Sequence, residues 1–291
     1  MNSRVRISIG MPVYNGEASL AQALNSINSQ SYTDYEVIIS DNASTDNTAQ
    51  ICQEMASVNP RIKYFRQANN IGPAANFKFV LDRASAEYFH WFAADDTRSS
   101  NFLESNINFL DQNPDYVAST CPNRFEGEPE ANNVTFALVG TPSERFAAFL
   151  DHCWQSNGVF YSVVRTAVLR QCDVVGQPFF ASDWAVDLFL ASRGNVNRTD
   201  EGLLLLGASG ASSRPDAWRA FRSRPIEAVL PFFTFSAYAL KLAQPFPWAD
   251  RMSLLSRLVM LNYQGAYGQA FSAVYQRYQS RRLKKNNLST D

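Results

Sequence analysis

The chain has 291 residues, of which 46% are hydrophobic and 18% charged, so its apolar side chains suffice for a large buried core. Its formal net charge of −1 argues against a nucleic-acid-binding protein, which would carry a broad basic face. Four scattered cysteines without a CxxC pair, with only two histidines, exclude a conventional zinc cluster and a disulfide framework, and we expect a reducing, cytoplasmic setting.

Strand and helix patterns alternate through the first 120 residues. Residues 5–11 predict a strand that is closed by Pro12 and the turn at Asn15–Gly16, with a helix from about residue 17. Further strands are expected at 35–40, 62–65, 88–93 and 116–121, and further helices after the segment DNASTDNT, from Gly72–Pro73, and at 102–110. This alternation predicts an α/β fold, with a doubly wound, mostly parallel sheet flanked by helices.

The strand expected at residues 88–93 (YFHWFA) is almost wholly apolar, which is typical of a strand buried on both faces. Two carboxylates, Asp95 and Asp96, follow it. In an open α/β sheet, ligands bind beyond the carboxyl ends of the strands. The pair therefore predicts a site for Mn²⁺ or Mg²⁺ that would in turn hold a diphosphate. The alternative is that the two acids only open the turn into the next helix.

Polar residues also follow the first two strands, although the usual nucleotide-binding motifs are absent. The chain has neither GxGxxG nor GxxxxGK[ST], which disfavours a Rossmann dehydrogenase and a P-loop enzyme. Asp41 follows the second strand, where its carboxylate would accept the imide N–H of uracil or thymine or the N1–H of guanine. Tyr14 follows the first strand and would stack on such a base. The structural alternatives are a helix cap for Asp41 and a half-buried core aromatic for Tyr14.

Four segments taken together resemble family-2 glycosyltransferases of the GT-A fold: MPVYNGE, SDNASTDNT, NIGPAANF, and AADD after an aromatic strand. The resemblance covers about residues 7–117. It implies that Asp41 holds the nucleobase and that Pro12, Val13, Tyr14 and Asn15 line the base and ribose.

The resemblance also implies a metal motif at Asp95 and Asp96, with the question of which one touches the metal left open. The family commonly reads D-x-D-D here, and its first acid is replaced by Ala93, so one donor contact is in doubt. Arg66, after the third strand, would approach the donor phosphates, or it is simply an exposed arginine at a strand end.

The second half is expected to supply the acceptor site and the catalytic base. Asp183 precedes an apolar helix, where it would be either an N-cap or, by resemblance to the family's ED motif, the base; Ser182 replaces the glutamate of that motif. Asp187, one turn on, is expected on a solvated or structural face. Residues 158–164 predict a strand near the acceptor cleft. Three residues are expected near the acceptor, the tryptophans stacking on a sugar or lying in the core: Asn157, Trp154 and Trp184.

The C-terminal part, from Pro225 to about Tyr278, predicts two or three helices separated at PFPW (residues 245–248). No run of 18 apolar residues occurs and the N-terminal apolar stretch is too short for a signal peptide, so we expect neither a transmembrane helix nor a leader. Two basic clusters flank the helices and would be solvated faces or a surface that docks on anionic lipid. The clusters consist of Arg214, Arg219, Arg222 and Arg224, and of Arg281, Arg282, Lys284 and Lys285.

These patterns predict a glycosyltransferase domain at residues 1–215, with a nucleotide-sugar half to about 120, and a helical extension at 216–291. The expected reaction transfers a sugar from a UDP-, dTDP- or GDP-sugar to a glycan or lipid-linked acceptor, with inversion and with a divalent metal. By resemblance, the setting is bacterial polysaccharide or lipid-linked glycan assembly, in the cytoplasm or peripherally on the inner face of the membrane. The alternatives are a nucleotidyltransferase, whose Gly-rich phosphate loop is missing, and a weakly active or inactive binding protein of the same fold.

Overall fold

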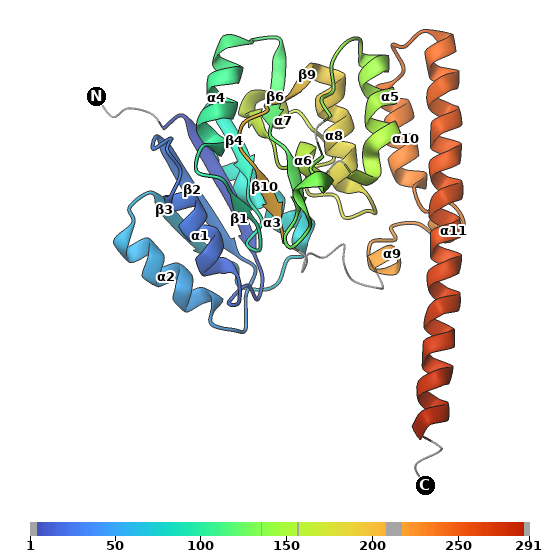
Figure 1. Ribbon diagram of the computed structural model, residues 1–291, viewed down its shortest axis with the longest axis horizontal. Coiled ribbons are helices and arrows are strands. Elements are labelled where there is room, and N and C mark those ends of the chain that lie inside the picture. Colours follow the sequence, from blue (N-terminus) through green and yellow to red (C-terminus); the bar gives the residue numbers. More distant parts are fainter. Residues whose placement is uncertain (1–4, 135, 156, 208–216, 288–291) are drawn as a thin grey trace. The chain divides into compact units, whose positions relative to one another are not determined.

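The computed structural model describes residues 5–134, 136–155, 157–207 and 217–287 (Figure 1). The chain divides into two compact units. Unit 1 comprises Met1–Pro178 and Ser182–Gly210, and unit 2 comprises Phe179–Ala181 and Ala211–Asp291. The boundary predicted at 215/216 lies outside the described residues.

Unit 1 is built on a seven-stranded sheet with the strand order β3-β2-β1-β4-β8-β6-β9. The strands β3, β2, β1 and β4 run parallel, whereas β8 is antiparallel to both of its neighbours. The chain order reverses between β1 and β4, which is where an open α/β sheet binds its ligand. The strands are β1 (Ile7–Val13), β2 (Tyr35–Asp41), β3 (Ile62–Arg66), β4 (Tyr88–Trp91), β6 (Tyr116–Thr120), β8 (Val163–Arg165) and β9 (Asn195–Arg198).

A small second sheet lies beyond β4, with the order β5-β10-β7. It joins β5 (Thr97–Arg98), β10 (Leu204–Leu206) and β7 (Asn123–Phe125). Because β5 follows the predicted acid pair directly, this sheet brings the distant segment around residue 205 next to the end of β4.

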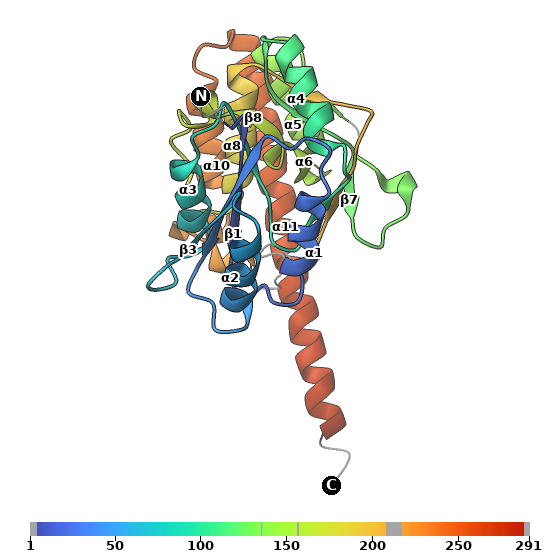
Figure 2. The same ribbon diagram turned by 90° about the vertical axis from the view of Figure 1, so that its left-hand side faces the viewer.

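Helices cover both faces of the main sheet. α1 (Leu20–Asn28), α2 (Thr48–Val58) and α4 (Phe102–Gln112) pack on one face, and α3 (Pro73–Arg83) packs on the other, so that β1 lies between α1 and α3 (Figure 2). The remaining helices of unit 1 are α5 (Pro142–His152), α6 (Asn157–Phe160), α7 (Thr166–Leu169) and α8 (Ser182–Arg193), with short 3₁₀ turns at Glu130–Asn132 and Cys153–Gln155.

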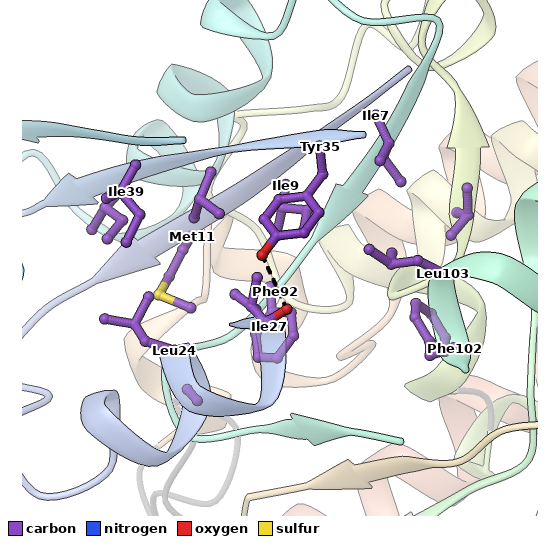
Figure 3. Packing of buried hydrophobic residues seen from close by; sticks show 14 of the residues in the cluster. Ile7, Ile9, Met11, Leu24, Ile27, Tyr35, Ile39, Phe92, Phe102 and Leu103 are labelled. Atoms are coloured by element: carbon purple, nitrogen blue, oxygen red, sulfur yellow. Dashed lines mark hydrogen bonds between the residues drawn. The ribbon is translucent and has the colours of Figure 1, made fainter. Parts of the chain in front are cut away.

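The main core forms where alternate side chains of β1 meet the apolar side of α1 (Figure 3). Ile9 and Met11 lie against this helix, and the hydroxyl of Tyr35 donates to the carbonyl of Ile27 at 3.3 Å. On the opposite face of β1, a β-carbon at Gly10 would lie 2.6 Å from the ring of Phe89. A glycine is therefore required for the strand to pack this closely.

Three predicted boundaries were wrong. β1 continues through Pro12 to Val13, because β4 pairs with β1 only as far as Gly10 and the missing N–H of the proline then faces an unpaired side. The first helix begins at Leu20 instead of about residue 17. Residues 158–164 form the end of α6 and the beginning of β8 instead of one strand, since a short apolar run does not distinguish the two by periodicity.

Unit 2 is helical, as predicted. It contains α9 (Ala217–Ala220), a 3₁₀ turn at Pro225–Ala228, α10 (Phe233–Leu242) and the 40-residue α11 (Trp248–Asn287), and the segment PFPW separates the two long helices. Asn262 of α11 accepts from the backbone N–H of Phe232 at 3.0 Å and donates to Ser236 at 2.9 Å. Of the helices in the described part of the chain, none combines the length and the apolar character that crossing a membrane requires.

Candidate functional site

Asp41 ends β2 and organises the loop that follows it. Its side chain is fully buried and accepts two hydrogen bonds, from the backbone N–H of Ser44 at 2.8 Å and from the hydroxyl of Tyr64 at 2.9 Å. The guanidinium of Arg66 lies 3.7 Å away and also donates to the carbonyl of Ser44 at 2.8 Å. A carboxylate has about four acceptor sites, so these contacts do not occupy all of them, but a base could reach this enclosed carboxylate only if the surrounding loop moved. In this structure, Arg66 holds the same loop.

The segment after β1 is tied to the same loop. The backbone N–H of Asn15 donates to Ser44 Oγ at 2.9 Å, and Asn15 Oδ1 accepts from the N–H of Thr45 at 2.9 Å. Pro12 and Val13 are buried within β1, and the carbonyl of Val13 accepts from the N–H of Asn42. Tyr14 is 50% exposed, so it is not a core aromatic. Of this segment, Tyr14 and Asn15 are thus exposed and Pro12 and Val13 are not.

Left-handed backbone marks three places near the predicted site residues. Among the described residues, the non-glycine positions with positive φ are Asn15 (51°), Ala43 (60°) and Ala181 (64°). Ala43 lies two residues after Asp41, and Ala181 lies two residues before Asp183. Strained backbone of this kind persists only where surrounding contacts enforce it, and it clusters at functional sites.

The acid pair after β4 is divided between two environments. Asp96 is buried, accepts from the N–H of Gly207 at 2.9 Å and pairs with Arg98 at 3.3 Å. Burial raises the pKa of Asp96, against the positive charge of Arg98, which lowers it. Asp95 is half-buried, and Gly207 lies directly against it, since a β-carbon there would be 2.4 Å from the carbonyl oxygen of Asp95. Asp96 is thus held by the protein, and Asp95 is the less buried of the two, with its carboxylate also close to Gly207.

Aromatic rings enclose the Asp96–Arg98 pair. The guanidinium of Arg98 lies over Phe92, with 4.4 Å to the ring centroid, and over Tyr161, with 5.6 Å. Desolvation raises the pKa of the Tyr161 phenol well above its ordinary value, and the charges of Asp96, Asp95 and Asp183 add to this effect. Tyr161 therefore lies within electrostatic range of all three carboxylates. The sequence placed this residue only in a general acceptor-side strand.

Asp183 lies in the first turn of α8, where its side chain reaches solvent. The protein around it nevertheless raises the pKa of its carboxyl through desolvation, against backbone hydrogen bonds at Trp184 and at Asp183 itself that lower it. A raised pKa makes the carboxylate a better proton acceptor. Because α8 begins at Ser182, Asp183 lies within the first helical turn and not at the predicted N-cap position, although a negative charge there still favours the helix N-terminus.

Asp187, one turn along α8, is buried, contrary to a solvated position. Among the described residues, neither of its oxygens has a hydrogen-bond partner, and burial raises the pKa of its carboxyl well above the ordinary value, with the charge of Asp183 as a second cause. An acceptor hydroxyl cannot approach a carboxylate so enclosed without rearrangement, and Asp187 is thus a poorer candidate base than Asp183.

The tryptophans near α8 contact one another. The rings of Trp154 and Trp184 meet edge to face with centroids 5.2 Å apart, and Trp184 also meets Phe149. Trp154 is about half exposed, so it presents one ring surface to solvent near the start of α8, as sugar stacking requires. Asn157 is the first residue of α6.

Two carboxylates suit a divalent ion that is held jointly with a ligand. No cluster of three or more His, Cys, Asp or Glu side chains able to hold a metal occurs in the described part of the chain. Mg²⁺ and Mn²⁺ are nevertheless commonly bound by one or two carboxylates together with substrate phosphates and water. The half-buried Asp95, with the buried Asp96 next to it in the chain, fits this arrangement.

Comparison with known proteins places these features in a family. Residues 8–173, more than half of the chain, match the model for glycosyl transferase family 2. The GalNAc(5)-diNAcBac-PP-undecaprenol beta-1,3-glucosyltransferase of Campylobacter jejuni is 32% identical over 167 residues, which cover 57% of this chain and 53% of that protein. The chain spans about half the length of these curated relatives, with shares of 43%, 42% and 53% for three of them.

Solved structures show the same fold. S. aureus TarS 1-349 in complex with UDP-GlcNAc superposes with a TM-score of 0.65 at 17% identity, over 87% of this chain and 71% of that one. The mannosyltransferase PcManGT from Pyrobaculum calidifontis, in complex with GDP-Man and Mn²⁺, gives a TM-score of 0.50 at 16% identity, over 96% and 83%. These likenesses confirm the predicted GT-A-like α/β fold, and the family match confirms the resemblance seen in the motifs: the chain belongs to glycosyl transferase family 2.

Proposed function

We propose that this protein transfers a sugar from a nucleoside-diphosphate sugar to an acceptor hydroxyl, with inversion at the anomeric carbon. Three carboxylates from two distant segments carry the proposal: in addition to desolvation, Asp95, Asp96 and Asp183 each raise the pKa of the Tyr161 phenol and so lie within electrostatic range of it. Such a site has carboxylates for both halves of the reaction: one pair beside the leaving group and one carboxylate for the attacking hydroxyl.

The donor would be held at the ends of β1 and β2. Asp41 would accept the imide N–H of uracil or thymine, or the N1–H of guanine, through the acceptor capacity that Ser44 and Tyr64 leave free. The exposed ring of Tyr14 would stack on the base. The relatives support nucleotide sugars as a class, because TarS was solved with UDP-GlcNAc and PcManGT with GDP-Man.

The diphosphate would lie at the end of β4, where Asp95 would hold a divalent ion, Mn²⁺ or Mg²⁺, with Asp96 behind it. PcManGT was solved with Mn²⁺, which supports a divalent metal in this fold. When bound, such an ion offsets the negative charge that grows on the departing nucleoside diphosphate. Ala93, in place of the first family acid, removes one donor contact, so we expect weaker donor binding than in relatives that keep the acid.

Asp183 would act as the general base. It would take the proton from the acceptor hydroxyl while that oxygen forms a bond to the anomeric carbon and the bond from this carbon to the phosphate oxygen breaks, releasing the nucleoside diphosphate. One displacement from the opposite face inverts the anomeric centre. Trp154 and Trp184 would stack on the acceptor sugar, and Asn157 would lie beside it.

The acceptor class is a glycan or a lipid-linked glycan of bacterial surface assembly. The Campylobacter jejuni relative is named for an acceptor linked to undecaprenol diphosphate, which supports this class.

A panel of UDP-, dTDP- and GDP-sugars tests the proposal. We expect one base class to raise the melting temperature of the full chain, more so with Mn²⁺, and to release nucleoside diphosphate slowly even without acceptor. The alternative function is a binding protein that has lost turnover, and Ala93 in place of the family acid is the reason to consider it. Metal-dependent stabilisation without release of nucleoside diphosphate from any donor would favour this alternative. If no donor stabilises the protein and no donor releases nucleoside diphosphate, the transferase and the binding protein are both refuted.

A further inference from the structure

An exposed apolar face runs along α11 in unit 2. Its buried side, with Leu254, Leu258 and Leu261, packs within unit 2. A second set of large apolar side chains is exposed instead, spaced three or four residues apart, so that it forms a stripe along another side of the helix. This stripe consists of Trp248, Met252, Leu255, Val259, Tyr263 and Tyr267, with Met260 beside it.

The stripe is extensive for a surface helix. Trp248, Val259 and Tyr263 are 71%, 62% and 68% exposed. It covers five turns of a helix that runs for 40 residues, roughly 60 Å, and that is drawn as one unbroken coil (Figures 1 and 2). Contiguous apolar surface of this kind marks a binding site in soluble proteins. The aromatic residues, Trp near one end and Tyr near the other, are those that favour the boundary between membrane and water.

The charge of unit 2 indicates what kind of surface the stripe binds. Residues 211–291 contain twelve Lys and Arg and four Asp and Glu, a formal charge of +8, whereas residues 1–210 contain fourteen and twenty-three, a formal charge of −9. The net charge of −1 thus conceals two units of opposite sign. The last turns of α11 continue this trend, because residues 271–287 include five basic residues and no acidic one.

We propose that the α11 stripe docks unit 2 on an anionic phospholipid surface. The apolar and aromatic side chains would enter the headgroup boundary, and the basic residues of unit 2 would meet the lipid phosphates. A second copy of the chain fits less well, because two surfaces that each belong to a unit of charge +8 would repel one another. The negative unit 1 would be repelled by the same lipid, so only unit 2 would face it.

Vesicle sedimentation with the full chain tests this proposal. We expect binding to vesicles of phosphatidylcholine with phosphatidylglycerol to be at least about tenfold tighter than to phosphatidylcholine alone, and to weaken with salt. Val259→Asp should weaken it by about tenfold or more. Val58→Asp is the matched control, because Val58 is 78% exposed on α2 of unit 1, and it should bind as the wild type does.

A second readout protects the test against misfolding. Arg251→Gln and Arg257→Gln each remove one positive charge and leave the stripe in place. Each should weaken binding to the anionic vesicles by about fivefold. Bromine-labelled lipid should quench the fluorescence of the wild type more than that of Trp248→Phe. Equal affinity for neutral and anionic vesicles, or no affinity for either, overturns the proposal. A dimer in solution that Val259→Asp dissociates, without vesicle binding, assigns the stripe to a second copy instead.

Discussion

The acid pair after β4 should respond very differently when each member is replaced by alanine. In Asp96→Ala, Arg98 loses its ion partner while its side chain is only 1% exposed, and the N–H of Gly207 loses its acceptor. Removing one member of a buried pair leaves an uncompensated charge and costs about 3–5 kcal/mol. For a unit of about 200 residues, this lowers the melting temperature by on the order of 10 °C.

Asp95→Ala should instead keep most of the stability and lose the response to metal, because Asp95 is only half-buried, whereas Asp96 is buried. The assay is thermal unfolding with and without Mn²⁺ and nucleoside diphosphate. Asp82→Ala provides the control for an exposed pair, since Asp82 bonds only the exposed Lys78 at 2.6 Å in α3 and should cost well under about 1 kcal/mol. An Asp96→Ala variant that melts like Asp82→Ala and has lost its metal response would refute this division of roles.

Three further changes test the site and its supports. Asp183→Asn should lower kcat by about 10²- to 10⁴-fold with little change in melting temperature, since asparagine has the same size and Asp183 is exposed; near-normal turnover would place the base elsewhere. Ala43→Gly should stabilise the fold by about 1 kcal/mol, because φ is 60° there, and an unchanged or lower denaturant midpoint would contradict the strain. Burial raises the pKa of Asp187, so the native state binds its proton more tightly than the unfolded chain and loses stability as pH rises above about 4. Asp187→Asn should lack this loss, so the melting temperature of the variant minus that of the wild type should increase between about pH 4 and 7. A difference that stays constant over this range would contradict the raised pKa of Asp187.

Local pattern was sufficient for the outline of the fold. The second and third strands and the helices of unit 1 up to residue 112 follow from apolar periodicity and from turn residues, which act over a few neighbouring positions. Asp41, Asp95 and Asp96 were found because parallel strands bring their carboxyl ends to one edge. Residues 158–164 were misassigned because the choice between helix and strand there depends on pairing with β4 and β6, which lie far away in the sequence.

What the sequence determined by itself is the alternating α/β order, the set of acids at strand ends and the helical C-terminal part, since each depends on residues that are neighbours in the chain. Only the tertiary structure separated Asp96 from Asp95, because the partner that fixes Asp96 at Gly207 is 111 positions away. It likewise brought Tyr161 within electrostatic range of three carboxylates and buried Asp187 with no hydrogen-bond partner in the described part of the chain. Burial and charge pairing arise from contacts between distant segments, and no local periodicity encodes them.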